Sequence, residues 1–543
     1  YAFGLKGGNY AFVQPFIDIN QPISESFRFR FTGEFTQHNH TIEVLNTKRY
    51  NLNPSIIWAN ESSTLTLQGK YSKWQQQDYQ GLPATGTVAG DFMINPRLFI
   101  GPADIGDSQS ELGSIWGTFE HQLNEHWAIV AKARYVYSLH DTITQGIMGE
   151  DFDFGADTPL SAENLALMGY PFQEHSWGLG SNELYQQSDE ITFQLYSTVF
   201  FDFKNSQHTV LTGGDFSQFN EVAFLDFNAL PIAVTDLTQP EFLPYSAPGE
   251  REQNQFTRNT TYGGYIQLQS TFYERLHLLT ALRVGHVDSD YKNTTPGFEF
   301  TTDASSTRFL PNVGAVFDLT DEYAFFIHYS QGMRAQNGVN FVSTPKPELS
   351  EQFEFGLKFD SAEQLTGQLA LYRINKTNIA ITDFSDPQLR ATTAGQQHSQ
   401  GVESNISWQV SEDFKLLATY AFTDARFSDS LIVAKGNHLP GVPEHSGRVW
   451  LNYAFPEGLL NGLSIGAGLY AQSSVYLENN NLFRSEAFYS MDAAIAYRYD
   501  RYKFGLAVKN LTDNHYYQRL NYFGTRTMPA QGTEVFVTGT ITF

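Results

Sequence analysis

The sequence predicts an all-β protein: a transmembrane barrel of 22 antiparallel strands with short turns on one rim and long loops on the other. Three observations predict it. Apolar and polar residues alternate in many short segments, no apolar run is long enough for a spanning helix, and ten tight polar turns punctuate the chain. Residues 1–543 are expected to form this one barrel domain.

Composition favours a barrel over a helical membrane protein. The chain has 543 residues, 41% of them hydrophobic, with 29 Tyr and 45 Phe, yet its net charge is −24. A spanning helix needs roughly 20 consecutive apolar residues, and no such run occurs. A closed barrel is the other structure that satisfies all backbone polar groups in hydrocarbon, and it hides its apolar residues in alternation.

Alternating segments recur from the first residues to the last. A short first strand is expected near Tyr1–Lys6, and clear two-faced strands follow at 27–35, 65–71, 129–137 and 491–499. The final segment, Glu534–Phe543, places Val535, Val537 and Ile541 on one side and threonines on the other. Successive side chains of a strand point to opposite faces, so each segment has one lipid-compatible face.

Ten tight turns set the strand count. Between successive turns the chain goes out and back through a longer far-side loop, so ten turns and eleven loops give 22 strands, with both termini on the short-turn rim. A barrel of this size has a lumen too wide for side chains to fill, and a plug is expected upstream because none is recognisable in the chain. The predicted turns are Gln21–Ser24, Asn60–Ser63, Asn124–His126, Asn205–Gln207, Glu274–Leu276, Thr320–Glu322, Ser361–Glu363, Ser411–Asp413, Glu457–Asn461 and Asp500–Arg501.

Three far-side loops are long enough to be functional, at 75–110, 141–187 and 221–256. They carry aromatic residues, which grip a ligand with little loss of conformational entropy. The alternative is that these rings lie at the membrane interface or pack loop against loop.

Several function classes are disfavoured. The chain has no cysteine, which excludes disulfides and thiol catalysis, and its negative charge disfavours a nucleic-acid partner. His38 and His40 share a strand face but lack a clear third metal ligand. The acidic run Glu150–Asp157 lacks calcium-loop spacing, so a solvated loop is favoured. No nucleotide-binding or hydrolase motif is present, and we expect no enzymatic activity.

Five stretches, in order along the chain, resemble the barrels of TonB-dependent ferric-siderophore receptors. They are KPELSEQFEFGLK at 346–358, LALYRINKTNI at 369–379, AGQQHSQGVE at 394–403, LPGVPEH at 439–445 and KNLTDNHYY at 509–517. QGLPATGTV at 80–88, INPRLFIGPAD at 94–104 and HTVLTGGDFSQF at 208–219 are similar to the hydroxamate (ferrichrome) type. The resemblance implies a plug domain upstream of residue 1.

The resemblance implies a receptor and active transporter in the outer membrane of a Gram-negative bacterium. It implies a TonB-type partner acting through the plug, contact with outer-membrane lipid and lipopolysaccharide, and a monomer. Ferric iron would arrive as a siderophore chelate, with no resident cofactor. Tyr79 lies where a loop aromatic contacts the chelate in this family, and Tyr522 and Phe523 lie in the last loop. The expected ligand-binding residues are Trp74, Tyr79, His175, Trp177, Tyr185, Arg334, Gln336, Gln396, His398, Tyr522 and Phe523.

Other functions stay open. A bare barrel would be a passive diffusion pore, and a receptor for haem or a corrinoid would need a loop histidine such as His175 or His398. The acidic loops favour a neutral or weakly charged chelate, unless Arg334, Arg390, Arg484, Arg519 and Arg526 gather at the mouth.

Overall fold

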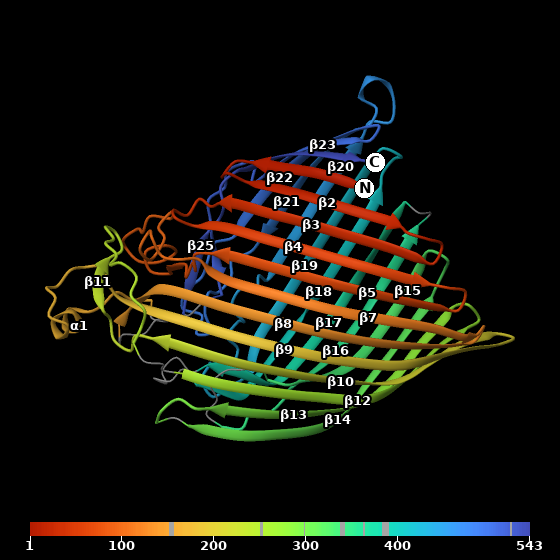
Figure 1. The fold of residues 1–543 in the computed structure, drawn as a ribbon, viewed down its shortest axis with the longest axis horizontal. Helices are drawn as coiled ribbons and strands as arrows, with labels where there is room; N and C mark the ends of the chain where they lie inside the picture. The colour runs from red at the N-terminus through yellow and green to blue at the C-terminus, as the bar shows by residue number, and fades with distance from the viewer. Residues whose placement is uncertain are drawn as a thin grey trace.

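A computed structural model describes residues 1–150, 157–249, 253–297, 299–336, 343–361, 364–382, 390–521 and 524–543. Its wall is one sheet of long antiparallel strands (Figure 1). The wall strands are β1 (Ala2–Gly8), β2 (Val13–Pro22), β3 (Phe27–Asn39), β4 (Asn46–Ala59), β5 (Ser63–Gln76), β7 (Ser108–Asn124), β8 (Trp127–Met148), β9 (Ser176–Phe203), β10 (Ser206–Phe227), β12 (Gln253–Phe272), β13 (Leu276–Asn293), β14 (Phe300–Asp318), β15 (Tyr323–Arg334), β16 (Glu348–Ser361), β17 (Leu365–Thr382), β18 (Ala391–Gln409), β19 (Phe414–Asp429), β20 (His445–Ala454), β21 (Leu463–Gln472), β22 (Phe488–Tyr499), β23 (Tyr502–Lys509) and β26 (Glu534–Thr542).

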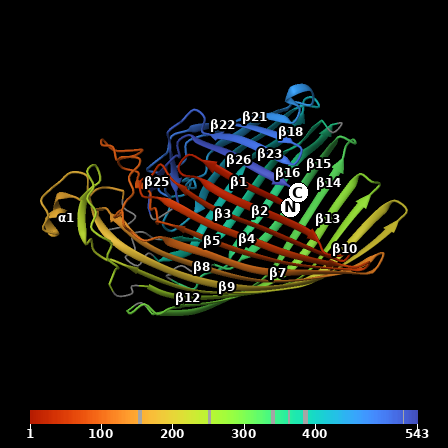
Figure 2. The same cartoon turned by 45° about the horizontal axis from the view of Figure 1, so that its top comes forward.

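The barrel closes through its first and last strands. Each wall strand pairs antiparallel with the next, and β1 pairs with β26 from Ala2 opposite Thr542 to Gly8 opposite Phe536. The amino group of Tyr1 donates to the carbonyl of Phe543 at 3.2 Å. The predicted closed barrel of 22 strands is therefore confirmed, and Figures 1 and 2 show the two termini side by side.

The predicted turns join the expected strands on the rim that carries both termini, here called the short-turn rim. Nine lie wholly within the described residues, and the tenth, at 361–363, connects β16 to β17 but includes residues outside them. The short-turn rim also holds the 3₁₀ turn η2 (Gly458–Leu460). Opposite it lies the long-loop rim, where the connection of β1 to β2 spans only 9–12, shorter than expected of a far-side loop.

The wall has an apolar outer face and a polar lumen face. Phe353, Phe355, Leu369 and Leu371 are each exposed by 42–50%, as lipid-facing side chains must be in the isolated chain. Polar side chains of the opposite parity pair across the lumen face; one example is Arg30, whose Nη2 lies 2.8 Å from Asp18. Another lumen-face pair is Asp492 and Arg448, whose side chains lie 3.5 Å apart. No helix in the described ranges is long and apolar enough to span a membrane.

A folded cap stands on the long-loop rim. Three short strands from distant loops form its small sheet: β6 (Leu82–Pro83), β24 (Tyr517–Leu520) and β25 (Arg526–Pro529). Another strand, β11 (Ala233–Asp236), pairs with the upper end of β9, and α1 (Ala162–Leu167) lies beside it at the far end of the molecule (Figures 1 and 2). Gly81 has φ +78°, and a Cβ there would lie 2.7 Å from the carbonyl oxygen of Thr527, so the close approach of β6 to β25 needs glycine.

Candidate ligand-binding site at the long-loop rim

The cap has its own apolar core, which joins two loops to the upper end of β9. One cluster joins Leu82 and Ile94 of the 77–107 loop to Trp177 and Leu179 of β9, with Leu237 from the connection between β10 and β12. These five side chains are at most 1% exposed. Burial on this scale holds these segments together as one unit on the long-loop rim.

Two predicted ligand contacts are part of cap packing. Trp177 is fully buried, and Tyr79 is 7% exposed, with its ring 6.4 Å from that of Phe99. Burial raises the pKa of Tyr79, so the phenol stays neutral. Neither ring is open to a ligand in this arrangement, which supports the loop-packing alternative for both.

Trp74 faces the lumen. On β5 it has the parity of Gln68 and Lys70, opposite to the exposed outer residues Leu67 and Tyr71. It is half-buried and lies opposite Arg49 of β4 in the register. An indole beside a guanidinium at the mouth of the lumen can contact both an apolar and a polar part of a chelate.

Tyr185 faces the other way. It has the parity of Ile191 and Leu195 on β9, whose exposed side chains face lipid, and the register contains no bulge between them. Its ring stacks on Phe224 at 6.1 Å, and its hydroxyl donates to Gln187 at 2.8 Å. This outward-facing position does not support the expected contact of Tyr185, as a loop aromatic, with a ferric siderophore.

His175 lies in the cap, where it stacks on Phe92 with ring centroids 3.9 Å apart. Its backbone has φ 62°, a left-handed conformation that is uncommon outside glycine. Its carbonyl accepts from the amide of Leu237 at 3.3 Å. These contacts describe a residue that shapes a loop junction.

Arg334 and Gln336 differ in availability although they are two residues apart. Arg334 has the lumen parity of β15, and its Nη2 lies 2.9 Å from Glu348, which also contacts Lys376 at 3.1 Å. The Arg334 side chain is 72% exposed, so it can still meet a ligand. Gln336 is buried, and its amide donates to the carbonyls of Lys346 and Asn378. Gln336 therefore joins loops.

Gln396 and His398 lie on the outer-face parity of β18, in line with Val402 and Trp408. His398 contacts the hydroxyl of Ser428 through Nδ1 at 2.7 Å. Neither outward-facing position supports the predicted contact with a ferric siderophore.

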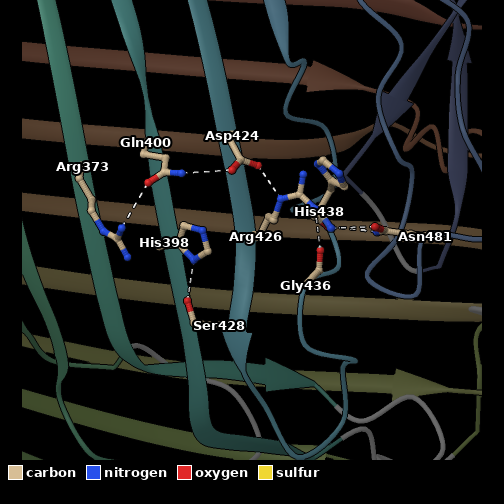
Figure 3. A network of polar contacts seen from close by, with 9 residues as sticks. All are labelled: Arg373, His398, Gln400, Asp424, Arg426, Ser428, Gly436, His438 and Asn481. Atoms are coloured by element: carbon tan, nitrogen blue, oxygen red, sulfur yellow. Dashed lines mark hydrogen bonds and ion pairs between the residues drawn. The ribbon is translucent and has the colours of Figure 1, made fainter.

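The polar network around His398 crosses three strands. Figure 3 shows Gln400 of β18 between Arg373 of β17 and Asp424 of β19, with bonds of 3.3 and 3.4 Å. Arg426 donates to Asp424 at 2.5 Å and to the carbonyl of Gly436 at 3.2 Å. The network fixes the 430–444 loop to the top of the wall.

The predicted contacts Tyr522 and Phe523 lie outside the described residues. Their neighbours belong to the cap: Leu520 packs against the cluster that contains Tyr79, and Arg526 is 1% exposed. Arg519 donates to the carbonyl of Leu477 at 2.7 Å, and burial lowers the pKa of Arg519. These two arginines serve cap structure rather than an open cationic mouth.

No group of three or more His, Cys, Asp or Glu side chains in the described part of the chain could hold a metal ion. His38 and His40 do come together, with ring centroids 4.5 Å apart, and His40 Nε2 contacts Thr47 at 2.9 Å. The acidic run falls mostly at 151–156, outside the described residues. Its first member, Glu150, accepts from the amide of Ser161 at 2.6 Å, as a loop-structuring carboxylate.

Sequence reasoning missed Arg49, Glu348 and Lys376. All three have lumen parity near the long-loop rim, together with Trp74 and Arg334. The alternation that defined the strands contained this signal, because counting by twos from an outward-facing residue assigns each to a face.

Comparison with known proteins agrees with the fold. A family described as "TonB dependent receptor-like, beta-barrel" matches residues 49–511. The chain is 23% identical to the metal-pseudopaline receptor CntO of Pseudomonas aeruginosa, covering 95% of this chain and 71% of that protein. It is also 23% identical to the ferrichrome outer membrane transporter/phage receptor of Escherichia coli, covering 94% and 70%. Among solved structures, the ferric-catecholate import receptor Fiu of E. coli has a TM-score of 0.82 at 19% identity, covering 100% of this chain and 81% of that one.

Proposed function

We propose, from the premise that this chain belongs to the TonB-dependent receptor β-barrel family, that it imports a ferric siderophore of hydroxamate or mixed type. A barrel of this family lies in the outer membrane of a Gram-negative bacterium and is energised through TonB. Iron enters as the cargo of the chelate, and the chain performs no bond chemistry.

The observation that supports the proposal is the lumen parity of Trp74, Arg49 and Arg334 near the long-loop rim, Trp74 and Arg49 side by side on β5 and β4 and Arg334 on β15. Trp74 offers a flat apolar surface, and the two arginines can donate to carbonyl or hydroxamate oxygens. The ferrichrome and ferrioxamine B receptors among its relatives support a hydroxamate chelate.

Charge supports a neutral or weakly charged ligand. The chain carries a net charge of −24, and the side chains of Arg519 and Arg526 are committed to the cap. Arg334 shares the carboxylate of Glu348 with Lys376. A multiply anionic tris-catecholate would meet little free positive charge at these positions.

The remaining partners follow from the same proposal. We propose that TonB acts through a plug domain encoded upstream, that the monomer is the working unit, and that lipopolysaccharide surrounds the upper wall. The coding sequence upstream of Tyr1 tests the first of these. A haem receptor is disfavoured, because His175 is stacked against Phe92 and His398 lies on the outer-face parity.

Binding of radioiron-labelled chelates to purified protein tests the ligand. Ferrichrome and ferrioxamine B are expected to bind more tightly than a ferric tris-catecholate. Trp74→Ala should weaken binding about tenfold, since a buried aromatic contact contributes of order 1 kcal/mol or more. Tyr185→Ala, on the outer face, is the matched control and should bind as wild type. Preferential binding of the tris-catecholate would overturn the ligand class, and equal affinities for both variants would overturn the site.

A further inference from the structure

The lipid-facing wall contains an apolar groove, with a volume of about 1500 Å³. Its lining runs from Leu65 and Phe119 through Ala131 and Gly214 to Gly264 and Val284. The same row includes Leu195, which is 59% exposed, so the groove opens outward. The volume exceeds the roughly 300–1,000 Å³ of common small-molecule pockets.

The groove follows the register across seven strands. Leu65 pairs with Phe119, Phe119 with Ala131, Ala131 with Leu195, Leu195 with Gly214, Gly214 with Gly264, and Gly264 with Val284. Six spacings of about 4.8 Å give a length of roughly 30 Å.

The two ends of the groove also lie at different depths in the membrane. Leu65 lies two residues from the start of β5, whereas Val284 lies eight residues from the start of β13, and both strands start at the short-turn rim. For strands tilted by about 40°, a line perpendicular to them rises by roughly 20 Å over its length, close to the height of the apolar band. The groove thus crosses the apolar band obliquely.

Small residues make the floor of the groove. Gly264 has space for a Cβ, whose nearest atom would be the Gly213 carbonyl oxygen at 3.8 Å, and Gly214 and Ala131 lie on the same row. Phe193 and Tyr262 are exposed by 47% and 45% and line one side of the groove. Each lies two residues from the row of small residues, toward the long-loop rim. A hollow in a membrane wall must be filled, because an empty apolar cavity forfeits dispersion contacts.

We propose that this groove holds an acyl chain of a phospholipid from the periplasmic leaflet. The groove is continuous with the lipid-facing apolar face of the wall. Below the groove, toward the short-turn rim and outside its lining, Trp127 is 44% exposed and its indole donates at 2.6 Å to Ser197, a lining residue, and His121 contacts Ser63 at 2.9 Å. Such a rim suits the carbonyl and headgroup region of a zwitterionic lipid.

The upper end disfavours the alternative source, an anionic lipid of the outer leaflet. The outer face of β9 to β14 above the groove carries Asp189, Asp288, Asp290 and Asp303 against Arg258 and Lys292. This balance is net negative, so phosphate groups are repelled there.

Native mass spectrometry of the protein purified from outer membranes in mild detergent tests the proposal. The wild type is expected to retain one phospholipid. Gly264→Leu combined with Ala131→Leu fills the groove and should reduce retained phospholipid at least tenfold. Gly539→Leu is the matched control, since Gly539 is an outward-facing glycine of β26 with no atom within 4 Å of an added Cβ, and it should retain the lipid.

Four outcomes would overturn the proposal. The first two are a wild type that retains no lipid and a filled variant that retains as much phospholipid as the wild type. The other two are a wild type that retains lipopolysaccharide in place of phospholipid and a wild type that forms a dimer which the filled variant does not form. Heat-shifted gel mobility verifies that each variant is a folded barrel. If the double variant does not fold, Gly264→Ala with Ala131→Val replaces it, with a smaller expected loss of about threefold. Chelate binding is measured on the same samples and should not change, which separates this proposal from the transport function.

Discussion

Replacing Trp177 by alanine should open the cap without harming the barrel. Trp177 is fully buried at the upper end of β9, among Leu82, Ile94 and Leu179. Leu82 and Ile94 come from the 77–107 loop and Trp177 and Leu179 come from β9, two segments that do not pair with one another in the described sheets. The indole is therefore the largest apolar link between them, and alanine would leave a cavity in its place.

The expected cost is about 3–5 kcal/mol, as for other buried Trp or Phe side chains cut to alanine. Burial of roughly 150–250 Å² at about 25 cal/mol per Å² gives a similar value of about 4–6 kcal/mol for the whole side chain. Since 1.4 kcal/mol is a factor of ten, local opening of the cap should become more frequent by about two to four orders of magnitude. The strand pairing of the wall below the cap does not involve Trp177, so the stability of the wall should not change.

Hydrogen exchange followed by mass spectrometry measures the frequency of local opening of the cap. Peptides covering 77–107 and 142–148 should lose protection in Trp177→Ala, while peptides of β13 and β17 should not change. Phe172→Ala, in the connection just before β9, is the control, because Phe172 is 62% exposed and belongs to neither of the two cap clusters described above. Unchanged protection in the Trp177 variant, or equal loss in both, would refute the role assigned to the cap core.

Three further predictions concern the wall, the lumen and pH. Gly401→Ala should prevent or strongly impair barrel folding in vesicles, since its Cβ would clash with the carbonyl oxygen of Phe422, whereas Gly539→Ala should fold normally. Glu348→Gln should raise affinity for an anionic chelate by about two- to tenfold by freeing two cations, and unchanged affinity would contradict this. Burial, reinforced by His38, lowers the pKa of His40 to about 4, so stability present above pH 6.5 should be lost as pH falls toward 4. Because the ring keeps some solvent contact, we expect the loss of local stability to be roughly 1–2 kcal/mol. Hydrogen exchange at residues 40–45, corrected for intrinsic exchange rates, measures this loss, and His40→Gln should not show it.

The wall was predictable because its determinants are local. Alternation shows which residues share a face, and each tight turn reverses the chain within a few residues, so strand number and closure followed from reading along the sequence. The alternation also contained the facing of three predicted site residues, because Trp74 has lumen parity whereas Tyr185 and His398 have outer parity. Assigning every second residue from the outward-facing Ile191 and Trp408 to the outer face would have excluded Tyr185 and His398 from the predicted site.

The cap was decided by tertiary structure alone. Whether Trp177 and Tyr79 meet a ligand or a neighbouring loop depends on segments far away in the chain, such as β6 and β25, which lie more than 440 residues apart yet pair with each other. No local period encodes that contact. Likewise, the outer groove arises only when glycines and alanines from successive strands fall into one register. The sequence by itself determined the barrel and the two faces of its wall, because backbone geometry acts residue by residue; the packing of distant segments determined which side chains stay open.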